Sequence, residues 1–363
     1  MQTTYTHEEL MADRDFAARV HHNGRLLHGG LDPDGNYLPP RSLHRLDAIE
    51  AWREQLRAAG HSTDVLGPEA IPDTYFPNED QARLLLRKGA RGAMARILTL
   101  IGVVEGFGND GIKLMPLLDF SDFIVEPIAG TCLAHLHVGL FEAHGNDEAG
   151  RGEESGHDQM WYAVRDAALD RPEILPDYFT NLPIAPPPGY TGPAQPSPEA
   201  MSVSGNTTPL VDNVDPMFQL TIRGMAMILQ IELMAFRTFS WAASVLGDSA
   251  CSVDPHFAAE TIGHIRRDEE IHVAYLQTAL AELAVRTVRT SDGSTMPGAQ
   301  LVEAAVAEAK SSQTGDRLAR TFAFRYSQIR DELARFDDGD EMLADFDALG
   351  PTPNIEPPTP ARL

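Results

Sequence analysis

The segment 217–246 constrains the fold of this chain more than any other. It reads MFQLTIRGMAMILQIELMAFRTFSWAASVL and is apolar on every side, with Arg223, Glu232 and Arg237 as its only charged residues. A helix that is apolar all round lies inside a bundle of other helices. An isolated carboxylate in such a place is costly, and it either takes up a proton or finds a cation. The sequence therefore predicts a buried helix in which Glu232 needs a partner.

A second helical segment, HIRRDEEIHVAYLQ at 264–277, carries a carboxylate and an imidazole at matching positions. Glu269 and His272 are three residues apart, so they share one face of a helix with apolar neighbours. Glu270 lies with two arginines on a different, solvated side. We expect Glu269 and His272 to point inward, as Glu232 does. Two buried carboxylates and a buried imidazole need a shared positive charge, which a metal ion would supply.

The same spacing occurs once more, in GEESGHDQMW. There Glu153-Glu154-x-x-His157 aligns with Asp268-Glu269-x-x-His272. A single Glu-x-x-His pattern is weak, because many helices contain one by chance. Two such patterns together with Glu232 form the arrangement that helical bundles use to hold two iron or manganese ions.

This pattern resembles the ferritin-like di-iron carboxylate superfamily, which includes acyl-carrier-protein desaturases, ribonucleotide reductase small subunits, rubrerythrins and arylamine N-oxygenases. The resemblance covers about residues 80–290. It implies an all-α, ferritin-like four-helix bundle and two iron ions, with manganese as the other candidate. The metal ligands that it implies are Glu105, Glu154, His157, Glu232, Glu269 and His272.

The carboxylate of the first bundle helix is the least determined of these ligands. Glu105 follows a long apolar run, and Glu142 is the substitute if the second helix is interpreted differently. By the same resemblance, Asp268 and Glu153 accept hydrogen bonds from the ligand histidine of the opposite pattern. Some N-oxygenases take an extra histidine from the region of His264. Here that residue lies five positions before Glu269, so we expect it off the ligand face.

The rest of the chain divides around this core. We expect an N-terminal extension at 1–78 that packs on the bundle, the core at 79–290, additional helices at 291–336, and a loose acidic, proline-rich tail at 337–363. A helix is expected at 42–59, and long helices from Asn78, over 217–246 and over 254–288. The helical region 127–168 contains several glycines, so we expect it to be broken or kinked. Residues 171–216 hold eleven prolines, so they form a crossover rather than a helix. We expect this crossover to cover a substrate entrance.

Composition limits the function. The net charge of −24 argues against nucleic acid and anionic membranes as partners. Two cysteines give no disulfide framework, and neither a signal peptide nor a membrane span is predicted, so we expect a cytoplasmic protein and possible homodimers. The resemblance implies a dioxygen-activating oxidoreductase that hydroxylates, N-oxygenates or desaturates a small or carrier-bound substrate, with the electron donor open. The alternative is a non-catalytic or peroxide-scavenging metal-binding protein.

Overall fold

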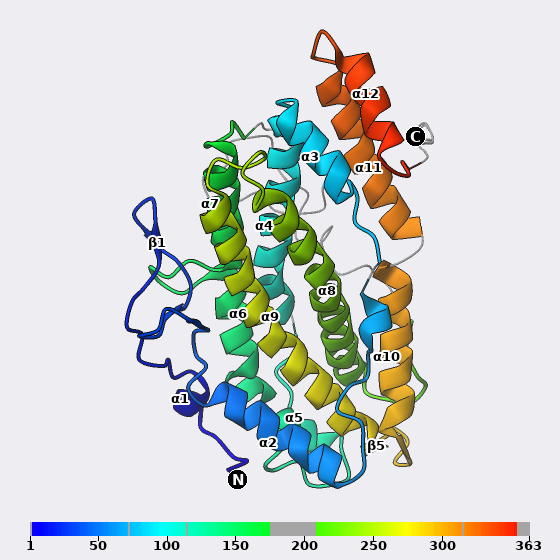
Figure 1. Ribbon diagram of the computed structural model, residues 1–363. Coiled ribbons are helices and arrows are strands. Elements are labelled where there is room, and N and C mark those ends of the chain that lie inside the picture. Colours follow the sequence, from blue (N-terminus) through cyan, green and yellow to red (C-terminus); the bar gives the residue numbers. More distant parts are fainter. Residues whose placement is uncertain (1, 72, 114, 175–207, 314–315, 354–363) are drawn as a thin grey trace.

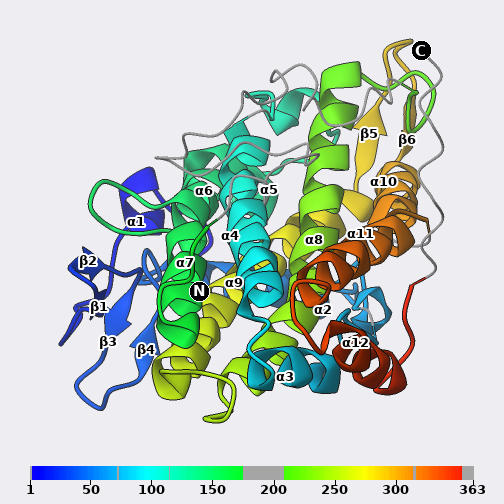
Figure 2. The ribbon, with the colours of Figure 1, turned by 90° about the horizontal axis from the view of Figure 1, so that it is seen from above.

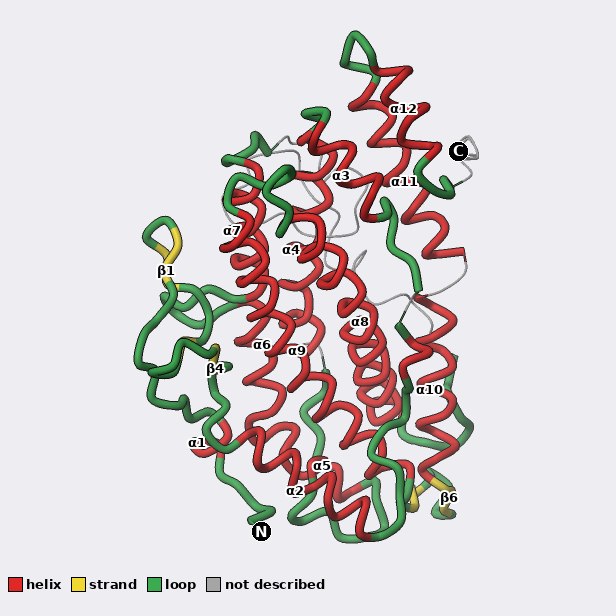
Figure 3. Tube along the Cα trace, viewed as in Figure 1, coloured by secondary structure: helices red, strands yellow, loops and turns green. Residues whose placement is uncertain are grey.

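The computed structural model describes residues 2–71, 73–113, 115–174, 208–313 and 316–353, and this part of the chain is mostly helical (Figure 3). The α-helices are α1 (His7–Leu10), α2 (Arg45–Ala58), α3 (Glu79–Arg87), α4 (Arg91–Lys113), α5 (Cys132–His135), α6 (Phe141–Ala149), α7 (His157–Leu169), α8 (Pro216–Leu246), α9 (Pro255–Ala284), α10 (Gly298–Gln313), α11 (Asp316–Leu333) and α12 (Gly339–Ala348). A short π-helix, Leu136–Leu140, joins α5 to α6.

The strands are short and lie at the edges of the molecule. They form three antiparallel pairs: β1 (His21–His22) with β2 (Arg25–Leu26), β3 (Gly30–Leu31) with β4 (Tyr37–Leu38), and β5 (Thr287–Arg289) with β6 (Thr295–Pro297). The predicted all-α class is therefore confirmed for the described residues. None of the helices in this part of the chain has the length and apolar character needed to cross a membrane.

Long helices form the centre of the molecule. Helices α6 and α7 follow one another in the same direction and pack against α4, which runs the opposite way, while α8 packs against the oppositely directed α9 (Figures 1 and 2). Asp215 caps α8 and Asp254 caps α9, each with a proline in the first turn, as the sequence suggests. Outside this centre, α2 crosses α9, α10 lies along α8 and α9, and α11 and α12 pack near α3 and α4.

The structure differs from the prediction at the helix expected from Asn78 and in the C-terminal tail. The helix expected from Asn78 is broken at Gly89, whose positive φ of 85° ends α3 before α4 begins. In turn, α4 continues through the glycine-rich stretch to Lys113, so Glu105 lies within a helix. The tail expected to be loose contains α12, whose Phe346 is fully buried. Most of the proline-rich crossover, 175–207, lies outside the described residues, and so does its expected role as a cover.

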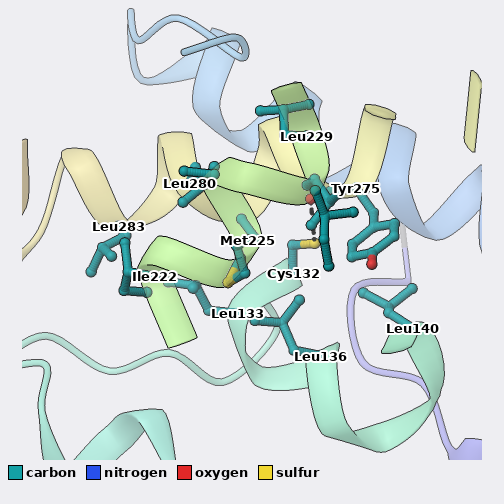
Figure 4. Packing of buried hydrophobic residues seen from close by; sticks show 14 of the residues in the cluster. Cys132, Leu133, Leu136, Leu140, Ile222, Met225, Leu229, Tyr275, Leu280 and Leu283 are labelled. Atoms are coloured by element: carbon teal, nitrogen blue, oxygen red, sulfur yellow. Dashed lines mark hydrogen bonds between the residues drawn. The ribbon is translucent and has the colours of Figure 1, made fainter. Parts of the chain in front are cut away.

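Two hydrophobic clusters fill the centre, one toward each end of the long helices. The first joins α5, the first half of α8 and the second half of α9; Figure 4 shows it around Tyr275, whose carbonyl accepts a hydrogen bond from the Cys132 thiol. The second joins α3, α7 and the opposite halves of α8 and α9. Along α4, α8 and α9 the buried apolar residues change from one cluster to the other. A polar layer lies at this change.

Candidate metal centre

The polar layer is a cluster of carboxylates and imidazoles contributed by five helices. Two donor groups of four residues form its centre: one contains His144, Glu148, Glu232 and His272, and the other contains Glu105, Glu148, His157 and Glu269. A smaller group of His28, His157 and Asp268 adjoins the second through His157. In each group one nitrogen or oxygen atom per residue lies within 4.8 Å of the others. Glu148 belongs to both groups, so the two groups are adjacent. The layer has the composition and the geometry of a candidate site for two metal ions.

The structure brings together five of the six residues expected as ligands. They are Glu105, His157, Glu232, Glu269 and His272. Glu154 does not join them, because it lies in the loop between α6 and α7, where its carboxylate contacts the guanidinium groups of Arg19 and Arg41. Glu148 takes the position expected for Glu154. The alternative first carboxylate, Glu142, is half exposed and pairs with His7, so the geometry favours Glu105.

The loop between α6 and α7 explains why Glu154 misled the sequence interpretation. Its two ends meet: a Cβ on Gly156 would lie 2.3 Å from the Gly150 nitrogen and 2.4 Å from the Glu148 carbonyl oxygen. Residues 150–155 are thus an excursion out of an otherwise continuous helical direction. Without them the chain would read Glu148-Ala149-Gly156-His157, which is a Glu-x-x-His pattern. The excursion interrupts the complete pattern, and Glu154 within it forms a second Glu-x-x-His spacing with His157 by chance.

Atoms of the two groups are spaced as ligands of shared ions would be. Glu148 Oε1 lies 3.4 Å from His144 Nε2, 3.4 Å from His157 Nδ1 and 3.3 Å from His272 Nδ1. Metal bonds to nitrogen and oxygen are about 2.1 Å long, which places neighbouring ligand atoms roughly 3.0–3.4 Å apart around one ion. The position of Glu148 Oε1 is therefore that of a ligand between both ions.

Glu269 lies between the same two groups. Its Oε1 is 2.7 Å from His157 Nδ1, and its Oε2 is 2.6 Å from His272 Nδ1, so each carboxylate oxygen faces one group. Glu232 and Glu105 each lie at one group only: Glu232 Oε1 is 3.2 Å from His144 Nε2, and Glu105 Oε2 is 3.9 Å from His157 Nδ1. If metal ions were bound, Glu148 and Glu269 would be shared by both groups, whereas Glu232 and Glu105 would each serve one group.

Within the described residues, several of these buried atoms make no well-directed hydrogen bond, although they lie close to one another. They are His144 Nε2, His157 Nδ1, Glu148 Oε1 and Glu269 Oε1. Buried polar atoms without well-directed hydrogen bonds are rare, because their remaining contacts return only part of the free energy lost with their hydration. All of them face the centre of the cluster. Once all four carboxylates are ionised they carry four negative charges, which two divalent cations would neutralise. The residues therefore fit a pair of divalent metal ions.

The remaining nitrogen of each imidazole is held from outside the cluster. His157 Nε2 is 3.2 Å from Asp268 Oδ2, His272 Nε2 is 2.9 Å from Asp147 Oδ2, and His144 Nδ1 is 2.8 Å from the Tyr275 hydroxyl. Such contacts fix the tautomer and orientation of metal-binding histidines. The expected contact of Asp268 with His157 is confirmed. The matching role suggested for Glu153 belongs to Asp147, since Glu153 is exposed in the excursion.

His144 is the ligand candidate that the sequence interpretation did not include. It lies one helical turn before Glu148, and its ring stacks on His272 with 3.7 Å between centroids. The signal available in the sequence was the Asp147-Glu148 pair, which repeats Asp268-Glu269, with a histidine four residues earlier. His264 stays outside both groups, as expected, and stacks on Tyr37.

The cluster has strongly shifted protonation in the absence of metal. Burial raises the pKa of Glu105 and Glu232 well above the ordinary value, and the nearby Glu269 and Glu148 raise it further. Burial lowers the pKa of His272, but Glu269 outweighs it and holds that pKa well above the usual range. The same balance raises the pKa of His157. Metal binding needs neutral imidazoles and ionised carboxylates, so it must release protons.

These pKa shifts predict that a rise in pH lowers the stability of the metal-free protein and raises its affinity for metal. Groups whose pKa is raised on folding bind protons more tightly in the folded state, so the metal-free protein should lose stability as pH rises from about 6 to about 8. Metal affinity should increase over the same interval. Thermal unfolding and metal titration at both pH values measure these effects. His272→Gln should reduce the loss of stability, whereas His256→Gln, an exposed control, should not. A metal-free protein that gains stability over this interval would contradict the prediction.

Comparisons with known proteins do not place the chain. No family model matches it, and neither does any curated protein or solved structure.

Proposed function

We propose that this protein is a ferritin-like di-iron oxidoreductase that activates dioxygen to oxidise a small organic or carrier-bound molecule. The observation that carries the proposal is the buried layer of four carboxylates and three imidazoles, arranged in two donor groups with Glu148 and Glu269 between them. This ligand arrangement agrees with the resemblance of the two acid-Glu-x-x-His patterns to that superfamily, once the excursion at 150–155 is taken into account.

The donor set supports iron more than manganese, the other candidate of the sequence analysis. Carboxylates alone suit magnesium, calcium or manganese, whereas imidazole nitrogens suit iron, zinc and copper. Three imidazoles among seven donors therefore favour iron over manganese. Bound iron would supply the redox chemistry with dioxygen, and the protein would supply binding, orientation and exclusion of water. The hydrophobic clusters on both sides of the layer provide that exclusion.

The exposure of the ligands indicates the side from which a substrate would approach. Glu105 and Glu232 have side chains that are 9% and 7% exposed, whereas those of Glu148 and Glu269 are 2% and 0% exposed. The two more accessible carboxylates come from α4 and α8 and each bind one ion. We place the reaction on this α4–α8 side, with Glu148, Glu269 and the aspartates that hold the histidines behind it.

Among the possible reactions, the third imidazole favours N-oxygenation. The resemblance to arylamine N-oxygenases implies an extra histidine, and His144 fills this role from α6 instead of from the region of His264. The substrate class that we propose is therefore an aromatic or other primary amine, free or carried by a partner. The electron donor stays unassigned.

The test separates catalysis from metal storage. Anaerobic loading with iron(II) should give two irons per chain, and exposure to dioxygen in the presence of an electron donor and a panel of arylamines should give N-oxygenated products. The alternative, a storage or peroxide-scavenging protein, predicts uptake of many irons per chain, or consumption of peroxide with no organic product. Less than one iron per chain after loading would reject both functions.

A further inference from the structure

An N-terminal segment outside the central helices supplies buried polar side chains to the back of the metal centre. Residues 28–45 run beside α6 and α9 (Figure 1). The buried residues of this segment that face the cluster are His28, Tyr37, Arg41 and Arg45, all of which are at most 5% exposed. A charged or hydroxyl-bearing side chain is rarely buried so completely without a defined partner. The partners here are the two aspartates that hold the ligand histidines. His28 Nε2 lies between them, 3.2 Å from Asp147 Oδ1 and 3.8 Å from Asp268 Oδ2, whereas the other three residues each contact one of these aspartates.

Tyr37 acts on one of these aspartates. Its hydroxyl donates a hydrogen bond of 2.7 Å to Asp268 Oδ2, the oxygen that also lies 3.2 Å from His157 Nε2. The phenol ring stacks on His264 with 4.1 Å between centroids, which fixes the direction of the hydroxyl. Tyr37 is thereby connected to the His157 donor group through a single carboxylate.

Arg41 and Arg45 act on the other aspartate. Arg45 donates to Asp147 Oδ2 at 2.8 Å, and the same oxygen lies 2.9 Å from His272 Nε2. Arg41 Nε donates to Asp147 Oδ1 at 3.0 Å, so both oxygens of Asp147 are held by guanidinium groups. Burial raises the pKa of Asp147, but the positive charges of Arg45 and Arg41 outweigh this effect and keep that pKa well below its usual value. The His272 donor group is thereby connected to the segment by a different route.

We propose that residues 28–45 set the affinity of the two metal sites separately, with Tyr37 as the positioning residue for the His157 site and Arg45 for the His272 site. The proposal rests on the metal binding assumed in the proposed function. Each residue acts by orienting an aspartate, which in turn fixes the imidazole ring. Losing such an outer contact typically weakens metal binding about 10–100-fold.

Stepwise titration of the metal-free chain with cobalt(II), followed by its visible absorption, tests this proposal. Wild type should bind two ions. Tyr37→Phe should weaken one binding step about 10–100-fold and leave the other unchanged. Arg45→Met should weaken the other step, and Arg45→Lys should restore part of it. The matched control is Tyr326→Phe, which removes another tyrosine hydroxyl bonded to an aspartate at 2.7 Å, far from the site; both of its steps should match wild type.

A double-variant cycle shows whether Tyr37 acts through Asp268. Asp268→Asn should weaken the same binding step as Tyr37→Phe. Adding Tyr37→Phe to Asp268→Asn should weaken that step little further, because the effects of residues in one hydrogen-bonded series are not additive. Circular dichroism of each metal-free variant checks folding. If Tyr37→Phe does not fold, the two Arg45 variants decide by the same criterion.

The outcomes separate the two proposals. If wild type binds no cobalt and no iron, the proposed function fails. If wild type binds two ions but Tyr37→Phe and Arg45→Met leave both steps unchanged, or weaken both steps equally, the separate control by residues 28–45 is rejected and the di-metal function stands.

Discussion

Replacing Glu148 with alanine should abolish the binding of both metals, whereas replacing Glu154 with alanine should leave two metals per chain. Glu148 Oε1 lies within 3.4 Å of all three imidazole nitrogens that face the cluster, so its loss removes a shared ligand from both groups. Glu154 contacts Arg19 and Arg41 in the excursion instead. Elemental analysis of the iron-loaded variants measures the difference.

The Glu154 variant is the matched control, since it removes the same side chain six residues away. It should lower the melting temperature, because Arg41 is buried and loses one of its two acidic partners. Glu148→Gln extends the comparison, because it keeps the size of the side chain and removes only the charge; we expect it to lose at least one metal. Loss of metal from Glu154→Ala with retention in Glu148→Ala would reverse our assignment of the interrupted pattern.

Replacing Gly108, which binds no metal, should reduce the metal content nearly as much as replacing Glu148. A Cβ on Gly108 would lie 2.6 Å from the Glu148 Cγ, so Gly108→Ala should displace this carboxylate and reduce the metal content below one ion per chain. Elsewhere in a helix the same change stabilises by about 0.5–1 kcal/mol. Gly263 in α9 has nothing within 4 Å of the Cβ position, so Gly263→Ala should keep both metals and raise the melting temperature.

The comparison of the two glycine variants separates close approach from helix propensity. Both should show increased stability if propensity alone mattered. We expect only Gly263→Ala to do so, because Glu148 is buried and its Cγ has no free space to move into. Full metal content in Gly108→Ala would show that α4 and α6 can move apart at this point, and that the glycine-rich stretch of α4 is not required for the site.

The sequence predicted α8 and α9 well, and the reason is local. The limits of α8 and α9 follow from an uninterrupted apolar pattern and from Asp-Pro caps, all of which are short-range features. The inward direction of Glu269 and His272 follows from their spacing on one helix. The burial of Glu232 follows from the apolar surroundings of its own helix. For these residues the local pattern was sufficient.

Residues from 141–157 required the tertiary structure. The spacing rule assumes a continuous helix, and the excursion at 150–155 breaks that assumption. Sequence distance cannot show that Gly150 and Gly156 touch, so a chance pattern at 154–157 took the place of Glu148. The same error hid Asp147 and His144, which are separated from His157 by the excursion.

The amino-acid sequence by itself determined the helical class, the buried central helices and the face of α9 that carries Glu269 and His272, because helical periodicity depends only on neighbours within a few residues. Only the tertiary structure decided that Glu148 faces Glu269 and His272, and that Asp147 and Asp268 bind the outer nitrogens of the histidines. Tyr37 and Asp268 are 231 residues apart, and Arg45 and Asp147 are 102 apart. Contacts over such separations depend on how whole elements pack, and no local pattern encodes them.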